Sequence, residues 1–527
     1  MKRVSLFLLL LLPSAYFAWT YCDMPRFCRW IHDDSIYFVS AKSLADGQGY
    51  RILSLPGEPF QTKYPPLLPL VLAGVWKLNP EFPANLKLAA LVSWLALPLL
   101  LLLCLRLYRD YGFTEKEAWA VVALLAVNPY LLVYSSTILS ELPFTCLLIL
   151  CLLLCRRAAV ESAPLWWAVL AGVTGGLSFL TRTTGMLLLA SGAAYFLWHR
   201  RRKQAMWFVA AMLPFVAAWT LWTRMHSPQS SDTVTLYFTS YFGYFLYLVR
   251  PADLPMILWK NVDQWLMSAG ALVLPDVREA WLVRIITQTL GAAMIAGVVR
   301  MARKGRSLGY AFFAVPFSLM LLVWHVLPDQ RLIAPIYPLL LAGFWTEMRH
   351  IFGMIMGALG HRRKSQRIAA VAFGLAIVGV LGFGAWTQYE VGWRILPREL
   401  EQRRKERAVD EAAFRWMTSR LPPGAQLAAF HDPALYLYTG HRACGLIRPS
   451  MHMYRNDTSQ AYEAFTRLAG FAREHRLDYA YFADTDFPRH ISEADCRSVH
   501  WWLEANPELE LVHRFPSATL YRFVPRR

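Results

Sequence analysis

Long apolar segments constrain this chain more than any other feature of its sequence. A helix needs roughly 20 apolar residues to cross a hydrocarbon layer of about 30 Å, and several windows reach that length without a charged residue. Of the 527 residues, 56% are hydrophobic and only 17% are charged, which is more apolar material than a soluble domain needs for its core. The sequence therefore predicts an α-helical polytopic membrane protein.

The first apolar segment, Val4 to Tyr21, follows Lys2 and Arg3 and has the charge pattern of a secretory signal. Tyr16 and Trp19, however, occupy the region where a cleavage site would need small residues. We therefore expect a retained first transmembrane helix with a cytoplasmic N-terminus.

The net charge of the chain is +18 at pH 7. In a soluble protein, such a charge would make nucleic acid the first partner to consider. Here lysine and arginine gather in short clusters between apolar segments, as the positive-inside rule requires of cytoplasmic loops. We therefore assign the charge to membrane topology and expect no nucleic-acid partner.

The apolar segment Leu67 to Leu78 decides how the later helices thread the membrane. It starts after Pro65-Pro66 and is too short to span comfortably, so we expect it to lie along the membrane surface or to re-enter. With that choice the basic clusters at 156–157, 199–203, 300–306 and 361–367 all lie in the cytoplasm. The pattern then predicts about eleven crossings, which after the first are 86–108, 117–135, 138–155, 164–180, 184–198, 205–222, 281–299, 308–326, 333–346 and 368–386.

After residue 386 the chain becomes polar, with a charged segment from Arg398 to Arg407. We expect two domains: a transmembrane domain over 1–388, which includes a first outer loop over 22–66, and an extracytoplasmic α/β domain over 389–527. The second domain should contain a helix and several strands. The helix is expected at 460–475, and the strands at 426–430, 479–482, 509–515 and 518–523.

The eight cysteines divide by location. Four lie in apolar runs and are expected to be packing residues, namely Cys104, Cys146, Cys151 and Cys155. The other four would lie on the outer side, where an oxidising compartment would allow two disulfides, Cys22 with Cys28 and Cys444 with Cys496.

An acidic pair, Asp33 and Asp34, lies in the polar loop from Trp30 to Pro66. A carboxylate near a membrane can take the proton from an attacking hydroxyl, and it also favours the oxocarbenium-like state of glycosyl transfer. Lys63 lies near the other end of the loop and could stabilise the anion that leaves from a lipid phosphate. Such acids also occur in solvated loops, and a lone lysine there is often an interfacial anchor.

Three further charged residues lie at the predicted outer ends of helices, where positive charge is unusual. Glu141 begins a transmembrane run and could orient a substrate or bind a cation. Alternatively, it is a solvated acid at a helix N-terminus, where the helix dipole stabilises negative charge. Arg182 and Arg331 are candidates for phosphate contacts.

The outer loop from Met225 to Ala280 is rich in aromatic residues. It could cover a lipid-substrate groove or anchor the chain at the headgroup level. Its aromatic residues are Tyr237, Phe238, Tyr241, Phe242, Tyr244, Phe245 and Tyr247. Elsewhere no phosphate-binding loop, HExxH motif or paired CxxC motif occurs, so nucleotide hydrolysis and zinc proteolysis have no support.

The order of these features resembles the GT-C class of membrane glycosyltransferases, in particular the bacterial aminoarabinose transferases of lipid A and the protein O-mannosyltransferases. The resemblance covers about Lys2 to Trp386. It rests on DDSIYFVSAKSLADGQGY after the first helix, then TKYPPLLP, SELPFTCLLIL, LTRTTGMLLL and QRLIAPIYPLLLAG, in the expected order.

The resemblance implies an inverting transfer of a sugar from a polyprenyl-phosphate donor to a lipid, glycan or protein acceptor, at the outer face of the bacterial inner membrane. It matches Asp33 to the catalytic aspartate with Asp34 beside it, and it places Glu141 at a second acidic position. It implies donor-phosphate contacts for Lys63, which we extend to Arg182 and Arg331. Tyr37, Tyr50 and Tyr64 would belong to the substrate loop.

Two departures from the family pattern bear on substrate and metal. Asp34 stands where glutamate is common, and Gln61 and Thr62 stand where aminoarabinose transferases carry a metal-binding acid. No cofactor is therefore certain, and a divalent cation stays open. The main alternative function is a transporter or flippase of a phosphate-bearing lipid, although the paired halves and interrupted helices of transporters are not evident. A structural or regulatory membrane protein, whose outer domain binds a partner, is the third hypothesis.

Overall fold

The computed structural model describes residues 2–21, 33–228, 232–275, 280–359, 364–445, 451–455, 465, 467–483, 486 and 493–524. The chain forms two compact units, and each is built from three separate stretches of sequence. The first unit contains Met1–Thr20, Leu91–Trp219 and Pro255–Glu399. The second contains Tyr21–Ala90, Thr220–Leu254 and Leu400–Arg527.

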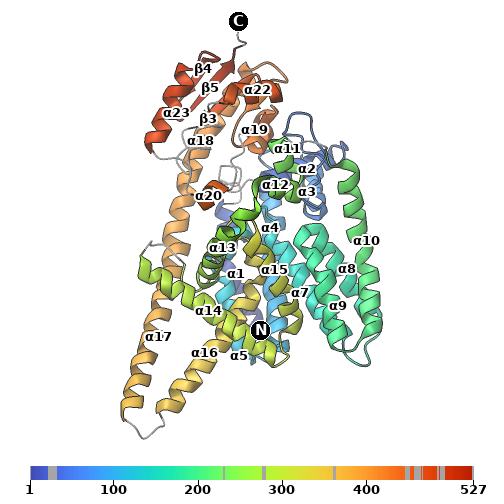
Figure 1. Cartoon of the computed structure of the whole chain (residues 1–527), viewed down its shortest axis with the longest axis vertical. Helices are drawn as coiled ribbons and strands as arrows, with labels where there is room; N and C mark the ends of the chain where they lie inside the picture. The colour runs from blue at the N-terminus through green and yellow to red at the C-terminus, as the bar shows by residue number, and fades with distance from the viewer. Residues whose placement is uncertain are drawn as a thin grey trace. The chain divides into compact units, whose positions relative to one another are not determined.

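The first unit is helical (Figure 1). Its helices are α1 (Lys2–Tyr21), α4 (Leu86–Asp110), α5 (Glu115–Ala126), α6 (Pro129–Ser136), α7 (Glu141–Ala158), α8 (Trp166–Thr181), α9 (Leu187–Trp198), α10 (Arg202–His226), α13 (Leu254–Gly270), α14 (Trp281–Arg303), α15 (Leu308–Val323), α16 (Tyr337–Leu359) and α17 (Lys364–Glu390). Short 3₁₀ turns, η1 (Thr183–Met186) and η3 (Ala334–Ile336), precede α9 and α16.

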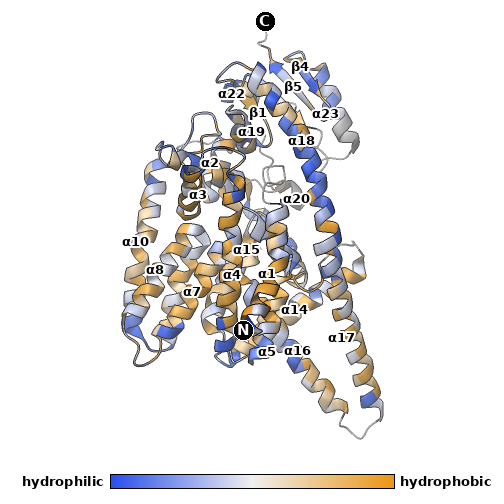
Figure 2. Ribbon diagram, turned by 180° about the vertical axis from the view of Figure 1, so that it is seen from behind, coloured by the Kyte–Doolittle hydropathy of each residue, from blue (hydrophilic) through white to orange (hydrophobic). Residues whose placement is uncertain are grey.

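Many of these helices are apolar over much of their length (Figure 2). Among the described residues, five helices are long and apolar enough to cross a membrane, or six if the bent pair α5 and α6 is one span. Shorter apolar helices include α8, α15 and α3 (Leu67–Leu78). These helices support a polytopic membrane protein, while the count of about eleven crossings stays a prediction.

Three predicted helices have wrong boundaries, and one of them is the helix expected over 333–346, since α16 continues to Leu359. The helix expected over 117–135 breaks into α5 and α6 with a bend of 62°. Pro129 has no N–H for a continuous helix, and the Asn128 side chain instead caps α6 by accepting a hydrogen bond from the Tyr130 N–H. The helix expected to end at Trp386 continues through a π-helical segment, η4 (Val391–Ile395), into α18 (Leu396–Arg420).

The polarity of the helix changes from α17 to α18. Figure 2 shows an apolar α17 followed by a hydrophilic α18, and the described helix runs over 56 residues, Ser365–Arg420. Pro397 lies at the start of α18, and the wide π turn just before it accommodates a residue that cannot donate a backbone hydrogen bond. The expected domain boundary at 388 thus falls within a continuous helix.

Glycines allow helices of the first unit to approach closely. A Cβ atom on Gly297 of α14 would lie 1.9 Å from the carbonyl oxygen of Gly343 on α16. Gly270 of α13 faces the Thr287 carbonyl of α14 at a comparable distance. Because lipid provides little hydrophobic drive for helix association, such close backbone packing is a main source of stability.

The second unit combines short helices with a mixed sheet. Its helices are α2 (Asp33–Ala45), α3, α11 (Thr233–Thr239), α12 (Tyr241–Leu248), η2 (Pro251–Asp253), α19 (Asp432–Thr439), α20 (Met451–Arg455), α22 (Leu468–His475) and α23 (Glu493–Ala505), together with most of α18. The first outer loop is therefore not irregular throughout, because residues 33–45 form a helix that begins with the acidic pair.

The five strands have the order β2-β1-β3-β5-β4. Their bounds are β1 (Leu427–Ala428), β2 (Ala443–Cys444), β3 (Tyr479–Ala483), β4 (Leu509–Phe515) and β5 (Ala518–Phe523). The β1 strand is parallel to β2 and β3, whereas β5 is antiparallel to β3 and β4. The core beneath the sheet includes Phe414 and Met417 from the end of α18 and Leu520 from β5.

The first outer loop packs against this C-terminal region within the second unit. The Ala443 N–H donates to the Ser54 carbonyl over 2.8 Å, next to an ion pair between Arg442 and Glu58. The rings of Phe82 and Tyr438 lie 4.8 Å apart.

The structure corrects one cysteine hypothesis. Cys444 is a free, buried thiol on β2, so the disulfide with Cys496 is not formed in this structure. Cys22, Cys28 and the Cys496 side chain lie outside the described residues. The four cysteines of the apolar runs are free and buried, as expected of packing residues.

Candidate active site

The acidic pair opens α2, where the helix dipole favours negative charge. Asp34 is fully buried, and its Oδ1 accepts a 2.6 Å hydrogen bond from the Ser35 N–H. Asp33 is partly exposed, and its Oδ1 accepts a 2.6 Å hydrogen bond from the Tyr64 hydroxyl. Of the two acids, Asp33 is therefore the one that a substrate can reach.

Lys63 lies next to Tyr64 and is enclosed by aromatic rings. Its Nζ donates to the Tyr237 carbonyl over 2.7 Å and lies 4.2 Å from the Tyr237 ring centroid and 5.0 Å from that of Tyr241. The side chain is buried, and within the described residues it forms no ion pair. Burial lowers the pKa of Lys63 to about 8, although the charge of Asp33 acts in the opposite direction.

Gln61 holds the backbone of this turn in place. Its side-chain Oε1 accepts hydrogen bonds from the N–H groups of Lys63, at 3.0 Å, and Tyr64, at 3.1 Å. Its carbonyl accepts from the Trp222 indole over 3.0 Å, and the neighbouring Thr62 hydroxyl donates to the Thr239 carbonyl over 2.8 Å. These two uncharged residues therefore fix the turn against Trp222 and α11, which belong to the same unit as the turn.

Of the predicted substrate-loop tyrosines, Tyr64 contacts Asp33 and Lys63, and Tyr37 and Tyr50 pack against Tyr64. The Tyr50 hydroxyl donates to the Tyr64 carbonyl over 2.9 Å, and the rings of Tyr37 and Tyr64 lie 5.0 Å apart in an edge-to-face contact. Burial raises the pKa of Tyr64 well above its usual value, and the charge of Asp33 adds to the shift. Tyr64 therefore stays protonated and can donate to the carboxylate at all physiological pH values.

Glu141, Arg182 and Arg331 meet in the first unit. Glu141 is fully buried at the start of α7, and its Oε1 lies 2.7 Å from Nη1 of Arg182 and 2.7 Å from Nε of Arg331. Arg182 also donates to the Ser140 hydroxyl over 3.1 Å. The carboxylate between two guanidinium groups orients both arginines, and the carboxyl group of Asp329 lies close enough to act on Arg331 and Glu141.

The sequence brought most of these residues to attention, but not the residues that hold them. Tyr237 and Tyr241 were recognised only as part of an aromatic loop, yet they form the surroundings of Lys63. Their spacing gave no signal, because Tyr237 lies on α11 and Tyr241 begins α12, with the extended residue Ser240 between the two helices. Gln61 gave no signal either, because its role depends on backbone groups of a turn.

Comparison with known proteins agrees with this architecture. The family described as dolichyl-phosphate-mannose-protein mannosyltransferase matches residues 63–224. No curated protein matches the chain.

Two solved structures share the fold at low sequence identity. One is ArnT from Cupriavidus metallidurans bound to undecaprenyl phosphate, at 15% identity and a TM-score of 0.57, covering 99% of this chain and 98% of that one. The other is the archaeal oligosaccharyltransferase AglB from Archaeoglobus fulgidus in complex with an inhibitory peptide and a dolichol-phosphate, at 12% identity and a TM-score of 0.52, covering 92% of this chain and 69% of that one.

These likenesses extend over 99% and 92% of this chain. Together with the apolar helices, they make the chain a multi-pass membrane protein. They also confirm the class predicted from the sequence: this chain has the fold of the GT-C membrane glycosyltransferases.

Proposed function

We propose that this protein transfers a sugar from a polyprenyl-phosphate donor to an acceptor hydroxyl, with Asp33 as the general base. The observation that carries the proposal is the Asp33–Tyr64–Lys63 arrangement. It places an oriented, accessible carboxylate beside a buried cation that forms no ion pair within the described residues. Glycosyl transfer from a phosphate needs a carboxylate that takes the proton of the acceptor hydroxyl and a cation that stabilises the leaving phosphate.

In this mechanism the acceptor oxygen attacks the anomeric carbon while the bond from that carbon to the phosphate oxygen breaks. The electron pair of that bond leaves with the polyprenyl phosphate, and the acceptor proton passes to Asp33. A single displacement of this kind inverts the anomeric configuration. The transition state is oxocarbenium-like, so the negative charge of Asp33 favours it in addition to accepting the proton.

Lys63 is proposed to bind the donor phosphate. Its Nζ now donates to a neutral acceptor, the Tyr237 carbonyl. A phosphate oxygen in that place would form a shorter, charge-assisted hydrogen bond, which is roughly twice as strong as a neutral one. The aromatic rings around the ammonium limit water, so less of the donor is lost to hydrolysis.

The arginine pair is a second proposed anion-binding group, located in the first unit. Glu141 contacts one nitrogen of each guanidinium group, and a guanidinium group has five N–H donors. We assign Glu141 to positioning the arginines rather than to proton transfer, because its Oε1 already accepts from both.

The acceptor is proposed to be a lipid, a glycan or a protein at the outer face of a bacterial inner membrane. The acceptor class and the membrane come from the resemblance to the GT-C class, and the positive-inside pattern of the basic clusters supports the outer face. Hexosyl and pentosyl donors are both compatible with the proposed chemistry.

The test is a transfer assay with purified full-length protein, a panel of polyprenyl-phosphate hexoses and pentoses, and membrane acceptor extracts. Asp33→Asn should lower transfer by at least about 100-fold, because general-base catalysis contributes 10²–10⁴-fold. Asp46→Asn is the matched control, since Asp46 follows the same helix but forms an exposed ion pair with Lys42.

Full transfer by the Asp33→Asn variant would refute the assigned base. A wild-type protein that transfers no sugar from any donor, but moves phosphate-bearing lipid between the leaflets of a liposome, would replace the proposed function with the flippase alternative.

A further inference from the structure

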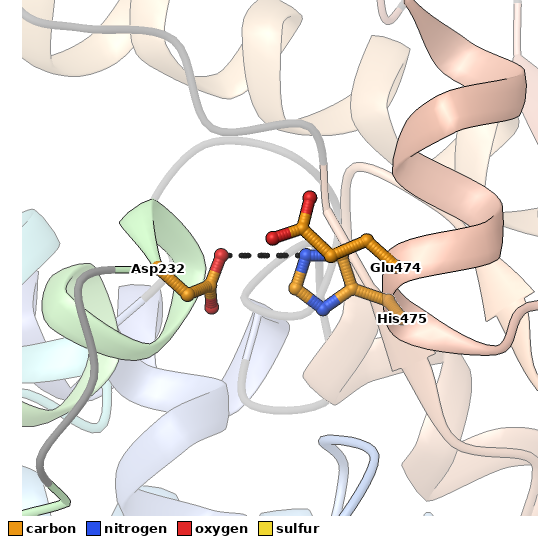
Figure 3. Close-up of side chains that lie close together, drawn as sticks. All are labelled: Asp232, Glu474 and His475. Carbon is orange, nitrogen blue, oxygen red and sulfur yellow. Dashed lines mark ion pairs between the residues drawn. The ribbon is translucent and has the colours of Figure 1, made fainter.

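Three metal-ligating side chains converge at a place far from Asp33 in the sequence. Asp232 caps the N-terminus of α11, and Glu474 and His475 end α22 of the C-terminal region. Figure 3 shows the two carboxylates and the imidazole directed toward one another. All three residues belong to the second unit.

The geometry suits a single bound ion. One ligand atom from each residue lies within 4.8 Å of the other two. Any triangle with sides of at most 4.8 Å contains a point within about 2.8 Å of all three corners. Zinc–nitrogen and zinc–oxygen bonds are about 2.0–2.2 Å, so side-chain shifts of less than about 1 Å would complete the coordination.

Asp232 and His475 form a long ion pair, and Glu474 takes no part in it. Oδ2 of Asp232 accepts hydrogen bonds from the N–H and the hydroxyl of Thr235, both at 2.8 Å, while its Oδ1 lies 3.4 Å from Nε2 of His475. Nε2 is buried and has no hydrogen-bond partner in the described structure. Glu474 has no hydrogen bond or ion pair with any described residue.

The surroundings of the three side chains include another carboxylate. The Cys444 thiol is buried near Asp432, Asp232 and Glu474, whose charges together with burial raise its pKa. Asp432 is itself almost fully buried. The ion pair between Asp232 and His475 does not include Glu474. A divalent cation would balance this group of carboxylates.

We propose that Asp232, Glu474 and His475 bind one divalent transition-metal ion, and that the ion is Zn²⁺. An imidazole ligand disfavours the hard cations Mg²⁺ and Ca²⁺, because these ions favour sites with only oxygen ligands. One imidazole and two carboxylates leave a fourth position for water in a tetrahedral site.

The proposed ion has a structural role. It joins α11, in the outer loop, to α22, in the C-terminal region. The Tyr237 carbonyl that accepts from Lys63 lies on α11. The metal would therefore hold the aromatic surroundings of Lys63 in place, and its binding can be measured whether or not the proposed transferase function holds.

The experiment uses full-length protein with an affinity tag free of histidine. Chelator-treated protein is loaded with Zn²⁺, freed of excess metal and analysed by elemental mass spectrometry, and its Tm is recorded with and without Zn²⁺. Wild-type protein should retain about one Zn²⁺ per chain and melt at a higher temperature when loaded. Glu474→Gln and His475→Gln should each lower the affinity at least about tenfold and remove the Tm increase.

Arg455→Gln is the matched control. Arg455 forms an ion pair with Asp253 at 2.8 Å, which also joins the outer loop to the C-terminal region but has no part in the cluster. This variant should bind Zn²⁺ as the wild type does. Glu474 is exposed and has no described partner, so Glu474→Gln should fold normally.

Two results would overturn the proposal. One is a wild-type protein that retains no more Zn²⁺ than the Glu474→Gln variant. The other is a site that binds Ca²⁺ or Mg²⁺ but not Zn²⁺, which would show that the imidazole is not a ligand.

Discussion

At the residue scale, the hydrogen bond from Tyr64 to Asp33 is the contact most open to a direct test. Tyr64→Phe removes the hydroxyl that orients the carboxylate at 2.6 Å. Hydrogen bonds to charged groups contribute about 1.5–3 kcal/mol, so kcat should fall by roughly 10- to 100-fold. Steady-state kinetics with a saturating donor measures this.

The control for that variant is Tyr247→Phe, which removes the hydroxyl of an exposed tyrosine on α12. An unchanged kcat in Tyr64→Phe, with a normal value in the control, would show that Asp33 does not depend on Tyr64 for its orientation.

Lys63 predicts a pH dependence of donor binding. Its pKa in the folded protein is lowered to about 8, so the ammonium loses its proton as the pH rises through 8. The KM for the donor should therefore increase above pH 8, and Lys63→Arg should shift that increase to higher pH because guanidinium stays charged. The measurement is KM against pH from 6.5 to about 9.5.

The lowered pKa of Lys63 weakens donor binding at high pH, but it acts in the opposite direction on the stability of the fold. Between about pH 8 and pH 10.5 the unfolded chain holds the Lys63 proton more tightly than the folded chain does. This group therefore makes the free energy of unfolding rise with pH over that range. A fall in Tm that parallels the rise in KM would mean that unfolding, and not loss of the Lys63 charge, explains the lost activity.

At the element scale, α14 and α16 can cross closely because Gly297 and Gly343 have no side chains at their contact. Gly297→Val would place atoms against the Gly343 carbonyl, which a Cβ atom would already approach to 1.9 Å. Overpacking costs about 1–3 kcal/mol or more, so the protein should melt several degrees lower in detergent. Gly353→Ala, on an open face of α16, should leave the Tm unchanged or slightly raised.

Elements with a strong local pattern could be predicted from the sequence. The bounds of β4 and β5 match their expected runs, and α4 and α14 extend their apolar segments by only a few residues. The structure departs from prediction where a distant contact or a local breaker decides. Pro129 divides one helix, and α2 forms where a polar loop was expected, since its burial against α3 was not visible in its own periodicity.

The candidate site was predictable in the same uneven way. Acids and cations in an unusual place drew attention to Asp33, Lys63 and Glu141 directly. Their partners depend on residues up to 190 positions away, as in the ion pair of Glu141 with Arg331. Periodicity carries no information about contacts over such separations.

At the scale of the whole molecule, the second unit depends on contacts between its first and last stretches of sequence. Arg442 on the C-terminal region pairs with Glu58 of the first outer loop. Arg442→Glu should lower the Tm and donor turnover, because two carboxylates would then face each other. Adding Glu58→Arg should restore part of the loss, and a double-mutant cycle gives the coupling energy.

Strictly additive effects in that cycle would show that the ion pair does not join the two stretches in solution. Both side chains are partly exposed, so a coupling of about 1 kcal/mol or less is expected.

The assembly of the second unit from separate stretches also determines when the protein can first become active in the cell. Glu58 and Arg442 are 384 residues apart, and ribosomes add about 5–20 residues per second. The outer loop with Asp33 and Lys63 thus waits roughly 20–80 s after its own synthesis for the C-terminal region. During biosynthesis, donor lipids would encounter a chain in which the proposed base and cation have been synthesised but the C-terminal region that supports them has not. A chain interrupted before its last hundred residues should therefore remain inert rather than hydrolyse its donor.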